Sequence, residues 1–375
     1  MKIKKRFFAF ALPFFLLASC QSDNKEDSTQ EEERVEQEDE SAAVSRNQLG
    51  KSYYRPALDE EGHYVTSQNR GETLSLNSGI NINLFEKDLI RLSQENYPTD
   101  QYFVQEGQYL SEELVSSWIG RESEDNPEGL NPAESGDEEN RNPRYLNSIL
   151  ELDFFEKEEE SLTFSGLSIA LALNSVDYYP AYQFGPTLEQ EIAEGKILEK
   201  GKEMANEMVR RMREIEGLEE IPIMVSLYKQ SERDDLAGGV YLAKGISNSA
   251  STVVESWDSL NEERLIFPLA GQSSAEANAF ANFKSEVEGF FPNISGITAR
   301  AHYVEDRLES LTINIQTQFY GETEMISYTQ YLKQSAATYL PADIATEIIV
   351  ESATGVEAFL EKGAADAEFY SHVFD

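Results

Sequence analysis

Cys20 carries the chemistry that the sequence shows most plainly. It is the one cysteine of the chain, so it has no partner for an intramolecular disulfide. Leu17, Ala18 and Ser19 precede it and complete a lipobox, the pattern at which the thiol is acylated and the peptide is cut just before the cysteine. We therefore expect Cys20 to be lipidated and to become the first residue of the mature chain.

The segment before Cys20 has the composition of an export signal. A basic start is followed by the apolar run Phe7–Leu17 and then by small residues. The run is too short for a permanent membrane span, which needs about 18 or more apolar residues. We expect residues 1–19 to be a signal peptide and the mature protein to be extracytoplasmic and lipid-anchored to the cell membrane. An ordinary secretory peptide with an incidental cysteine is the alternative.

The charge of the chain excludes several classes of partner. It has 31 basic and 69 acidic residues, for a formal net charge of −38. A surface this acidic repels phosphate backbones, so we expect no nucleic-acid partner. It also repels anionic lipid heads, so the expected membrane contact is the lipid on Cys20.

The chain that follows the signal peptide is expected to have three regions. Residues 20–45 are rich in Asp and Glu with almost nothing apolar, so we expect a disordered tether. We expect residues 46–160 to be a helical and loop region and 161–375 to be an α+β body. The expected helices are 83–93, 111–119, 188–215, 275–291 and 321–339. The expected strands are 162–176, 221–228, 239–244, 297–303, 308–319, 346–350 and 355–360, and 121–143 is expected to be a long loop.

The order of these elements indicates a repeat. A strand, a helix and two strands follow one another from 162 to 244, and again from 308 to 361. We expect mixed or antiparallel sheets with packed helices, arranged as two related β-α-β-β halves.

Residues suited to metal or nucleophilic chemistry do not group together along the chain. His63, His302 and His372 are scattered without metal-ligand spacing, and neither a nucleophile elbow nor a P-loop is present. We expect no metal, no cofactor and no enzymatic activity. The alternative is a cell-wall-directed hydrolase that uses paired carboxylates. The neighbouring acids Asp234-Asp235 and Glu262-Glu263 adjoin turns, and we expect them to be solvated.

Aromatic residues favour a binding role instead. Tyr178, Tyr179 and Tyr182 lie close together after the strand 162–176, and Trp118 and Trp257 are the only tryptophans. Exposed aromatic rings give a large contact area at low entropic cost. These five residues are the candidate contacts for a peptide or cell-wall ligand, and the other interpretation places their rings at the edge of the core.

Several strings along the chain are similar to one family. They are TSQNRG at 66–71, SSWIGRESEDNPEGLNP at 116–132, GLSIALALNS at 166–175, IPIMVSLYKQ at 221–230, FPNISG at 291–296 and FYGETEMISYTQY at 319–331. In these strings the chain resembles the CamS family of sex-pheromone-precursor lipoproteins from Gram-positive bacteria. The resemblance extends from about Tyr53 to the end.

The resemblance implies two products from one precursor. The mature lipoprotein is one, and its role in the family is poorly defined. The other is a short apolar pheromone, cut from the run directly before the lipidated cysteine by signal peptidase and other lipoprotein-processing enzymes. In this chain that run is Pro13, Phe14, Phe15, Leu16, Leu17, Ala18 and Ser19.

Overall fold

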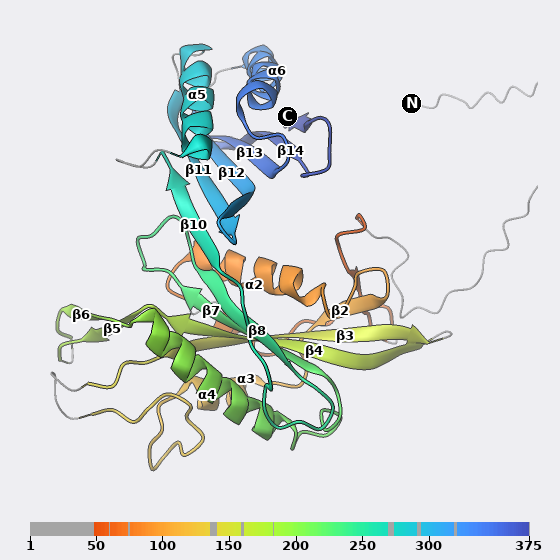
Figure 1. The fold of residues 1–375 in the computed structure, drawn as a ribbon, viewed down its shortest axis with the longest axis vertical. Helices are drawn as coiled ribbons and strands as arrows, with labels where there is room; N and C mark the ends of the chain where they lie inside the picture. Colours follow the sequence, from red (N-terminus) through yellow and green to blue (C-terminus); the bar gives the residue numbers. More distant parts are fainter. Residues whose placement is uncertain are drawn as a thin grey trace, which may run out of the picture. The chain divides into compact units, whose positions relative to one another are not determined.

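The computed structural model describes residues 49–59, 61–73, 76–135, 141–158, 161–182, 184–268, 274–290, 294–318 and 321–374 (Figure 1). The signal peptide 1–19, Cys20 and the tether 20–45 lie outside the described residues. Within the ranges given above, no helix has the length and apolar character that a membrane crossing requires.

The first sheet is built around a parallel strand pair. Its strand order is β1-β2-β3-β4-β7-β8-β9, and β4 runs parallel to β7. The helix between these two strands is α4, Glu194–Met212, the crossover that a parallel pair requires. The strands are β1 (Arg55–Pro56), β2 (Tyr102–Glu106), β3 (Leu146–Glu158), β4 (Ser161–Asn174), β7 (Ile223–Gln230), β8 (Val240–Ser247) and β9 (Asp258–Ser259).

The second sheet is also built around a parallel strand pair. Its order is β10-β11-β12-β13-β14-β15, and α6, Glu322–Tyr339, connects the parallel strands β12 and β13. The strands are β10 (Glu262–Phe267), β11 (Ile294–Val304), β12 (Arg307–Thr317), β13 (Ala345–Ser352), β14 (Gly355–Lys362) and β15 (Tyr370–Val373). A separate hairpin consists of β5 (Val176–Pro180) and β6 (Thr187–Glu191).

The two halves share one topology. The first runs β2-α3-β3-β4-α4-β7-β8-β9, with α3 at Glu112–Ile119. The second runs β10-α5-β11-β12-α6-β13-β14-β15, with α5 at Ala275–Phe290. In both, the central pair is parallel and every other pair of neighbours is antiparallel. The predicted pair of β-α-β-β segments is therefore part of a longer repeated unit.

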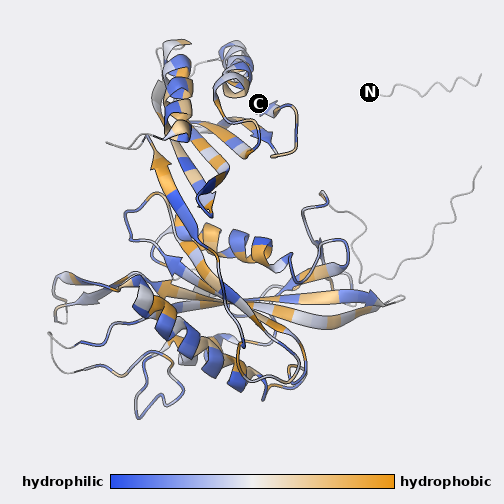
Figure 2. Ribbon diagram, in the orientation of Figure 1, coloured by the Kyte–Doolittle hydropathy of each residue, from blue (hydrophilic) through white to orange (hydrophobic). Residues whose placement is uncertain are grey.

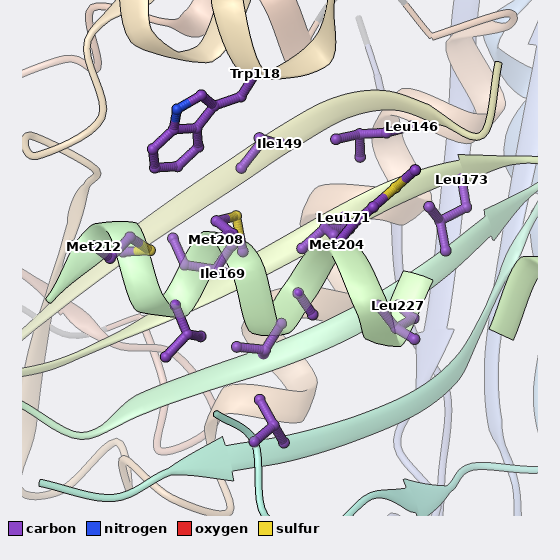
Figure 3. Packing of buried hydrophobic residues seen from close by; sticks show 14 of the residues in the cluster. Trp118, Leu146, Ile149, Ile169, Leu171, Leu173, Met204, Met208, Met212 and Leu227 are labelled. Carbon is purple, nitrogen blue, oxygen red and sulfur yellow. The ribbon is translucent and has the colours of Figure 1, made fainter. Parts of the chain in front are cut away.

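The first sheet has a core on each face. Helices α3 and α4 cover one face, where β4 contributes Ile169, Leu171 and Leu173 (Figure 3). Helix α2, Gly79–Ser93, covers the other face through Leu84, Phe85 and Leu89. Met204, Met208 and Met212 of α4 are all buried and fill this core with flexible apolar side chains. In Figure 2 the ribbon of α4 mixes hydrophilic and hydrophobic segments, as a helix with one buried side requires.

The second sheet has its core on one face, beneath α5 and α6 (Figure 1). Leu311, Ile313 and Ile315 alternate along β12 and are buried there, as their period of two predicts. A tight turn joins β11 to β12, between the strands expected at 297–303 and 308–319. Glu305 and Asp306 both have positive φ values there, which is the backbone twist that a two-residue hairpin favours.

Two predicted helix starts are wrong. The helix expected from 83 begins at Gly79, because Ser78 caps it by accepting a hydrogen bond from the Asn81 amide. The helix expected from 188 begins at Glu194, because residues 187–191 pair with β5 as the strand β6. Leu and Glu in residues 187–191 favour a helix, but backbone pairing with β5 outweighs that preference.

The predicted loop 121–143 and the predicted boundary at residue 160 can be placed on the described elements. The expected loop 121–143 holds no helix or strand in its described part, apart from an isolated bridge between Arg121 and Asn131. The predicted division at residue 160 falls between β3 and β4. These strands pair along nearly their whole length, so residues on both sides of 160 belong to one sheet.

A small helix, α1, lies at Arg70–Thr73.

Leu171 tests the central strand. Its side chain has no exposed surface, so Leu171→Ala should lower the free energy of unfolding by about 2–5 kcal/mol. Chemical denaturation measures the change. Leu236→Ala is the control, since that leucine is 62% exposed and should cost about 0.5 kcal/mol or less. Equal midpoints for the two variants would contradict the packing described for β4.

Candidate functional site

The predicted tyrosine cluster lies on the β5–β6 hairpin. The Arg233 guanidinium lies 3.9 Å from the centre of the Tyr178 ring, and the Arg141 guanidinium lies 3.9 Å from that of Tyr179. The Arg233 amide also donates a hydrogen bond to the Tyr178 hydroxyl oxygen. Tyr182 beyond them is 68% exposed. Both strand tyrosines therefore have an arginine on one ring face, and Tyr182 offers its ring to solvent.

The two tryptophans do not join this cluster. Trp118 is 2% exposed and packs in the core beneath α3 and α4 (Figure 3). Trp257 is partly buried against the same core, with the Lys202 ammonium 5.5 Å from its ring centre. The predicted set of five aromatics is thus split between a hairpin and a core. The expectation that Trp118 meets a ligand is corrected, because its ring has almost no accessible surface.

The histidines lie apart from one another. His63 is near Asp59 and Glu61 on the surface, His302 is buried, and His372 packs edge-on against Phe374. Among the described residues, no three His, Cys, Asp or Glu side chains are grouped so that they could hold a metal ion.

Glu262 differs from its prediction as a solvated acid. Its side chain is 1% exposed, accepts a hydrogen bond from Arg91 at 2.7 Å, and lies 3.2 Å from the imidazole Nε2 of His302. Strand alternation explains the difference, since β10 turns Glu262 inward and Glu263 outward. Asp234 is exposed as expected, and Asp235 is half-buried.

The network around Glu262 joins α2 to β10. Arg264 donates to Asp88 at 2.6 Å, and both side chains are at most 6% exposed. Arg91 also donates to Asp88, at 3.2 Å. Burial opposes ionisation of Asp88, but Arg264 and Arg91 hold its pKa below the usual value. Because Arg264 and Asp88 are both buried, loss of Asp88 would leave the Arg264 guanidinium without its counter-charge. The network therefore holds α2 against β10 and has a structural role.

A pair of carboxyl groups that the sequence analysis missed lies on β3. Glu151 and Asp153 are both buried, and their carboxyl groups meet the loop after β2. The amides of Tyr109 and Leu110 donate to Glu151 at 3.2 and 2.9 Å, and the amide of Gln108 donates to Asp153 at 2.9 Å. A Cβ on Gly107 would lie 2.3 Å from Glu151, so the loop approaches as closely as glycine allows.

The surroundings of the two carboxyls favour a proton on the pair near neutral pH. Asp153 Oδ1 is buried and meets no donor in the described part of the chain. Burial raises the pKa of Glu151, and burial together with the neighbouring Glu151 charge raises the pKa of Asp153 well above its usual value. A carboxyl and a carboxylate, bound by three loop amides, fit this geometry. The sequence does carry a signal for it, since two acids alternate on the face of β3 that also bears Ile149.

This pair is not accessible for catalysis. Glu151 is 1% exposed and Asp153 has no exposed surface, so substrate cannot reach either group. Burial also raises the pKa of the adjacent Tyr109 phenol to about 12, so that ring stays neutral near pH 7. The arrangement fixes the loop 107–110 and, through it, the start of α3.

Comparisons with known proteins support one family. The model of a family described as CamS sex pheromone cAM373 precursor matches residues 64–368. A solved sex pheromone precursor from Lactobacillus salivarius is 33% identical, with a TM-score of 0.83, and the match covers 88% of this chain and 98% of that one. The comparison with curated proteins gives no match.

A second solved structure, from Staphylococcus aureus, is similar. It is described as the C-terminal domain of the sex pheromone staph-cAM373 precursor. Its identity is 27% and its TM-score 0.70, over 80% of this chain and 98% of that one.

Asp153 tests the shared proton. Raised carboxyl pKa values mean that the folded protein keeps a proton that the unfolded chain has released, so stability falls as pH rises from about 4 through the folded pKa. Asp153→Asn keeps an acceptor for the Gln108 amide and removes this penalty. The variant should gain stability over the wild type as pH rises, by at most about 1.4 kcal/mol per pH unit.

Denaturation midpoints between pH 5 and pH 9 measure this gain. The control is Asp125→Asn, which removes an exposed acid and should give a curve parallel to that of the wild type. A parallel curve for Asp153→Asn as well would show that the pair holds no shared proton.

Proposed function

Because the chain belongs to the CamS family of sex pheromone precursors, we propose that it is a membrane-anchored extracellular lipoprotein whose signal sequence yields a short apolar pheromone. One observation carries the proposal: Leu17, Ala18, Ser19 and Cys20 follow a basic and then apolar start, in a chain of this family. Acylation of Cys20 would give a stable anchor. Each buried CH₂ of a lipid chain contributes about 0.8 kcal/mol of membrane affinity, and two acyl chains anchor a protein stably where one does not.

The proposed pheromone is the run Pro13–Ser19. It has no charged side chain, so it can partition into the membrane in which it is released. Its partners in production are signal peptidase and the other lipoprotein-processing enzymes. Its proposed role is a signal between cells in conjugation.

The mature domain is proposed to be a binding module without catalysis. Hydrolysis by paired carboxylates, the alternative, needs two carboxyls that open on a cleft. Among the described acids, the two whose pKa values are raised are Glu151 and Asp153, and both are buried. The exposed Tyr182 and the arginine-stacked Tyr178 and Tyr179 support a ligand-binding surface instead.

Cys20→Ala tests the anchor. The variant has no thiol to acylate, so it should be uncleaved or shed and should lose incorporation of labelled palmitate. Membrane fractionation and labelling measure both effects. Ser22→Ala is the control just beyond the cleavage site, and it should be processed like the wild type. Normal lipid labelling of Cys20→Ala would refute the anchor.

The released peptide can be sought directly. Trimming from the amino side should stall at Pro13, because proline fixes φ and lacks an amide hydrogen. Mass spectrometry of spent medium should therefore find a peptide that starts at Leu12 or Pro13 and ends at Ser19. In Pro13→Ala the start should move toward the carboxyl end. The pheromone proposal fails if mature protein accumulates while no fragment of residues 7–19 is found.

A further inference from the structure

The two halves of the repeat differ in one respect. In the first half α2 covers the sheet face opposite α3 and α4. In the second half only Leu260 and Asn261 separate β9 from β10, so the repeat has no counterpart of α2 at that place. Helices α5 and α6 lie on one side of the second sheet (Figure 1). The opposite face meets the side of α2 through Arg264 and Glu262, and through Glu347, which lies 3.7 Å from the Lys87 ammonium.

The part of this surface that extends from the Lys87–Glu347 contact, which we call the open face, carries polar and apolar side chains in two rows. Strand pairing aligns Arg300, Thr312 and Glu347 in one row. The next row aligns Asn314 and Ile349 with Phe359. All six side chains are half-buried. Their neighbours along each strand point into the core under α5 and α6, as strand alternation requires.

Two polar side chains of the open face keep some exposed surface. Within the described ranges, the side chains of Thr312 and Asn314 make no hydrogen bond. Ile349 and Phe359 add an apolar surface beside them. In the first half the corresponding face is apolar, with Ala170, Met224 and Tyr241 buried beneath α2. The second half thus replaces a helix-covered apolar face with a partly polar one.

Arg300 is the unusual member of this face. Of the arginines that the structure describes, it alone shows no ion pair, hydrogen bond or stacked aromatic ring, and its Nε is buried without an acceptor. Burial lowers its pKa, and the neighbouring positive charge of Arg264 lowers it further. Asp235 and Glu347 oppose this effect from a distance. Each is bound elsewhere, Asp235 to the Ala237 amide and Glu347 to Lys87.

We propose that the open face binds the released peptide Pro13–Ser19, with the carboxylate of Ser19 on the Arg300 guanidinium. The proposal rests on the proposed function, which supplies this peptide. Cleavage before Cys20 leaves a free carboxylate at Ser19, and guanidinium binds carboxylate through paired, charge-assisted hydrogen bonds. The rest of the peptide has no charged side chain, so its fit depends on apolar contact and on backbone hydrogen bonds.

The dimensions of the open face fit an extended peptide. From β11, which carries Arg300, to β14, which carries Phe359, there are three strand spacings, or about 14 Å. Four extended residues span about 13–14 Å. A carboxylate of Ser19 at Arg300 therefore places Phe15 near Phe359 on β14 and Leu16 near Ile349 on β13. Thr312 and Asn314 lie between and can bond the peptide backbone.

Calorimetric titration of the secreted chain 21–375, which retains every described residue, tests the proposal. The synthetic peptide Pro13–Ser19 with a free carboxylate should bind, and the same peptide with an amidated end should bind about tenfold or more weakly, because a hydrogen bond to a charged group is lost. Arg300→Gln should bind both forms equally weakly. Asp235→Asn should bind the free acid more tightly, since a competing negative charge is gone.

Arg307→Gln is the matched control, an arginine of the same sheet that is exposed and paired with Glu309. It should keep the preference for the free acid, and melting temperatures should show that both arginine variants are folded. Equal binding of acid and amide by the wild type, or a retained preference in Arg300→Gln, would overturn the proposal. Equally tight binding of a scrambled free-acid peptide would overturn the choice of occupant.

The titration separates this inference from the function on which it rests. The synthetic peptide tests the open face whether or not cells release it. If it binds but no fragment appears in the medium, the pheromone proposal fails and the open face stands. If the fragment appears but does not bind, the open face fails and the pheromone proposal stands.

Discussion

The parallel pair at the centre of each sheet is the constraint on which the rest of the structure depends. Parallel neighbours cannot be joined by a tight turn, so the chain must leave the sheet and return along a helix. Helices α4 and α6 are these crossovers, and each packs its apolar side on the pair that it connects. Outward from the pair, the remaining strands are added by antiparallel pairing, except for the two-residue strand β1, which pairs with β2 in parallel. The same arrangement, a parallel strand pair joined by a crossover helix, is thus used in both sheets.

Much of this fold could be predicted because its signals are local. Leu311, Ile313 and Ile315 identify β12 by their period, and the long apolar run of β4 identifies a strand that is buried on both faces. Ser111 identifies the start of α3, since its side chain accepts a hydrogen bond from the Leu114 amide. Such features depend on residues a few positions apart, and the sequence displays them directly.

The rest could not be predicted because it depends on pairs of residues far apart in the chain. Glu262 looks like a turn residue until Arg91 and His302 are placed beside it, and Arg264 meets Asp88 across 176 positions. Glu151 and Asp153 look solvated until the loop after β2 covers them. Tyr182 and Trp118 are both aromatic, but Trp118 is buried in the core that α4 covers, whereas Tyr182 stays exposed beyond the hairpin strands.

The separation of the cores has a consequence for the order in which the molecule can form. The cores of the first sheet draw their buried residues from positions before 260, whereas the core of the second draws on positions from 267 onward. A chain that emerges from its amino end can therefore close the first half before the second has been made. During that interval Asp88 has Arg91 beside it but lacks Arg264. When β10 forms, Arg264 pairs with Asp88. Folding of the second half therefore also stabilises α2 of the first half.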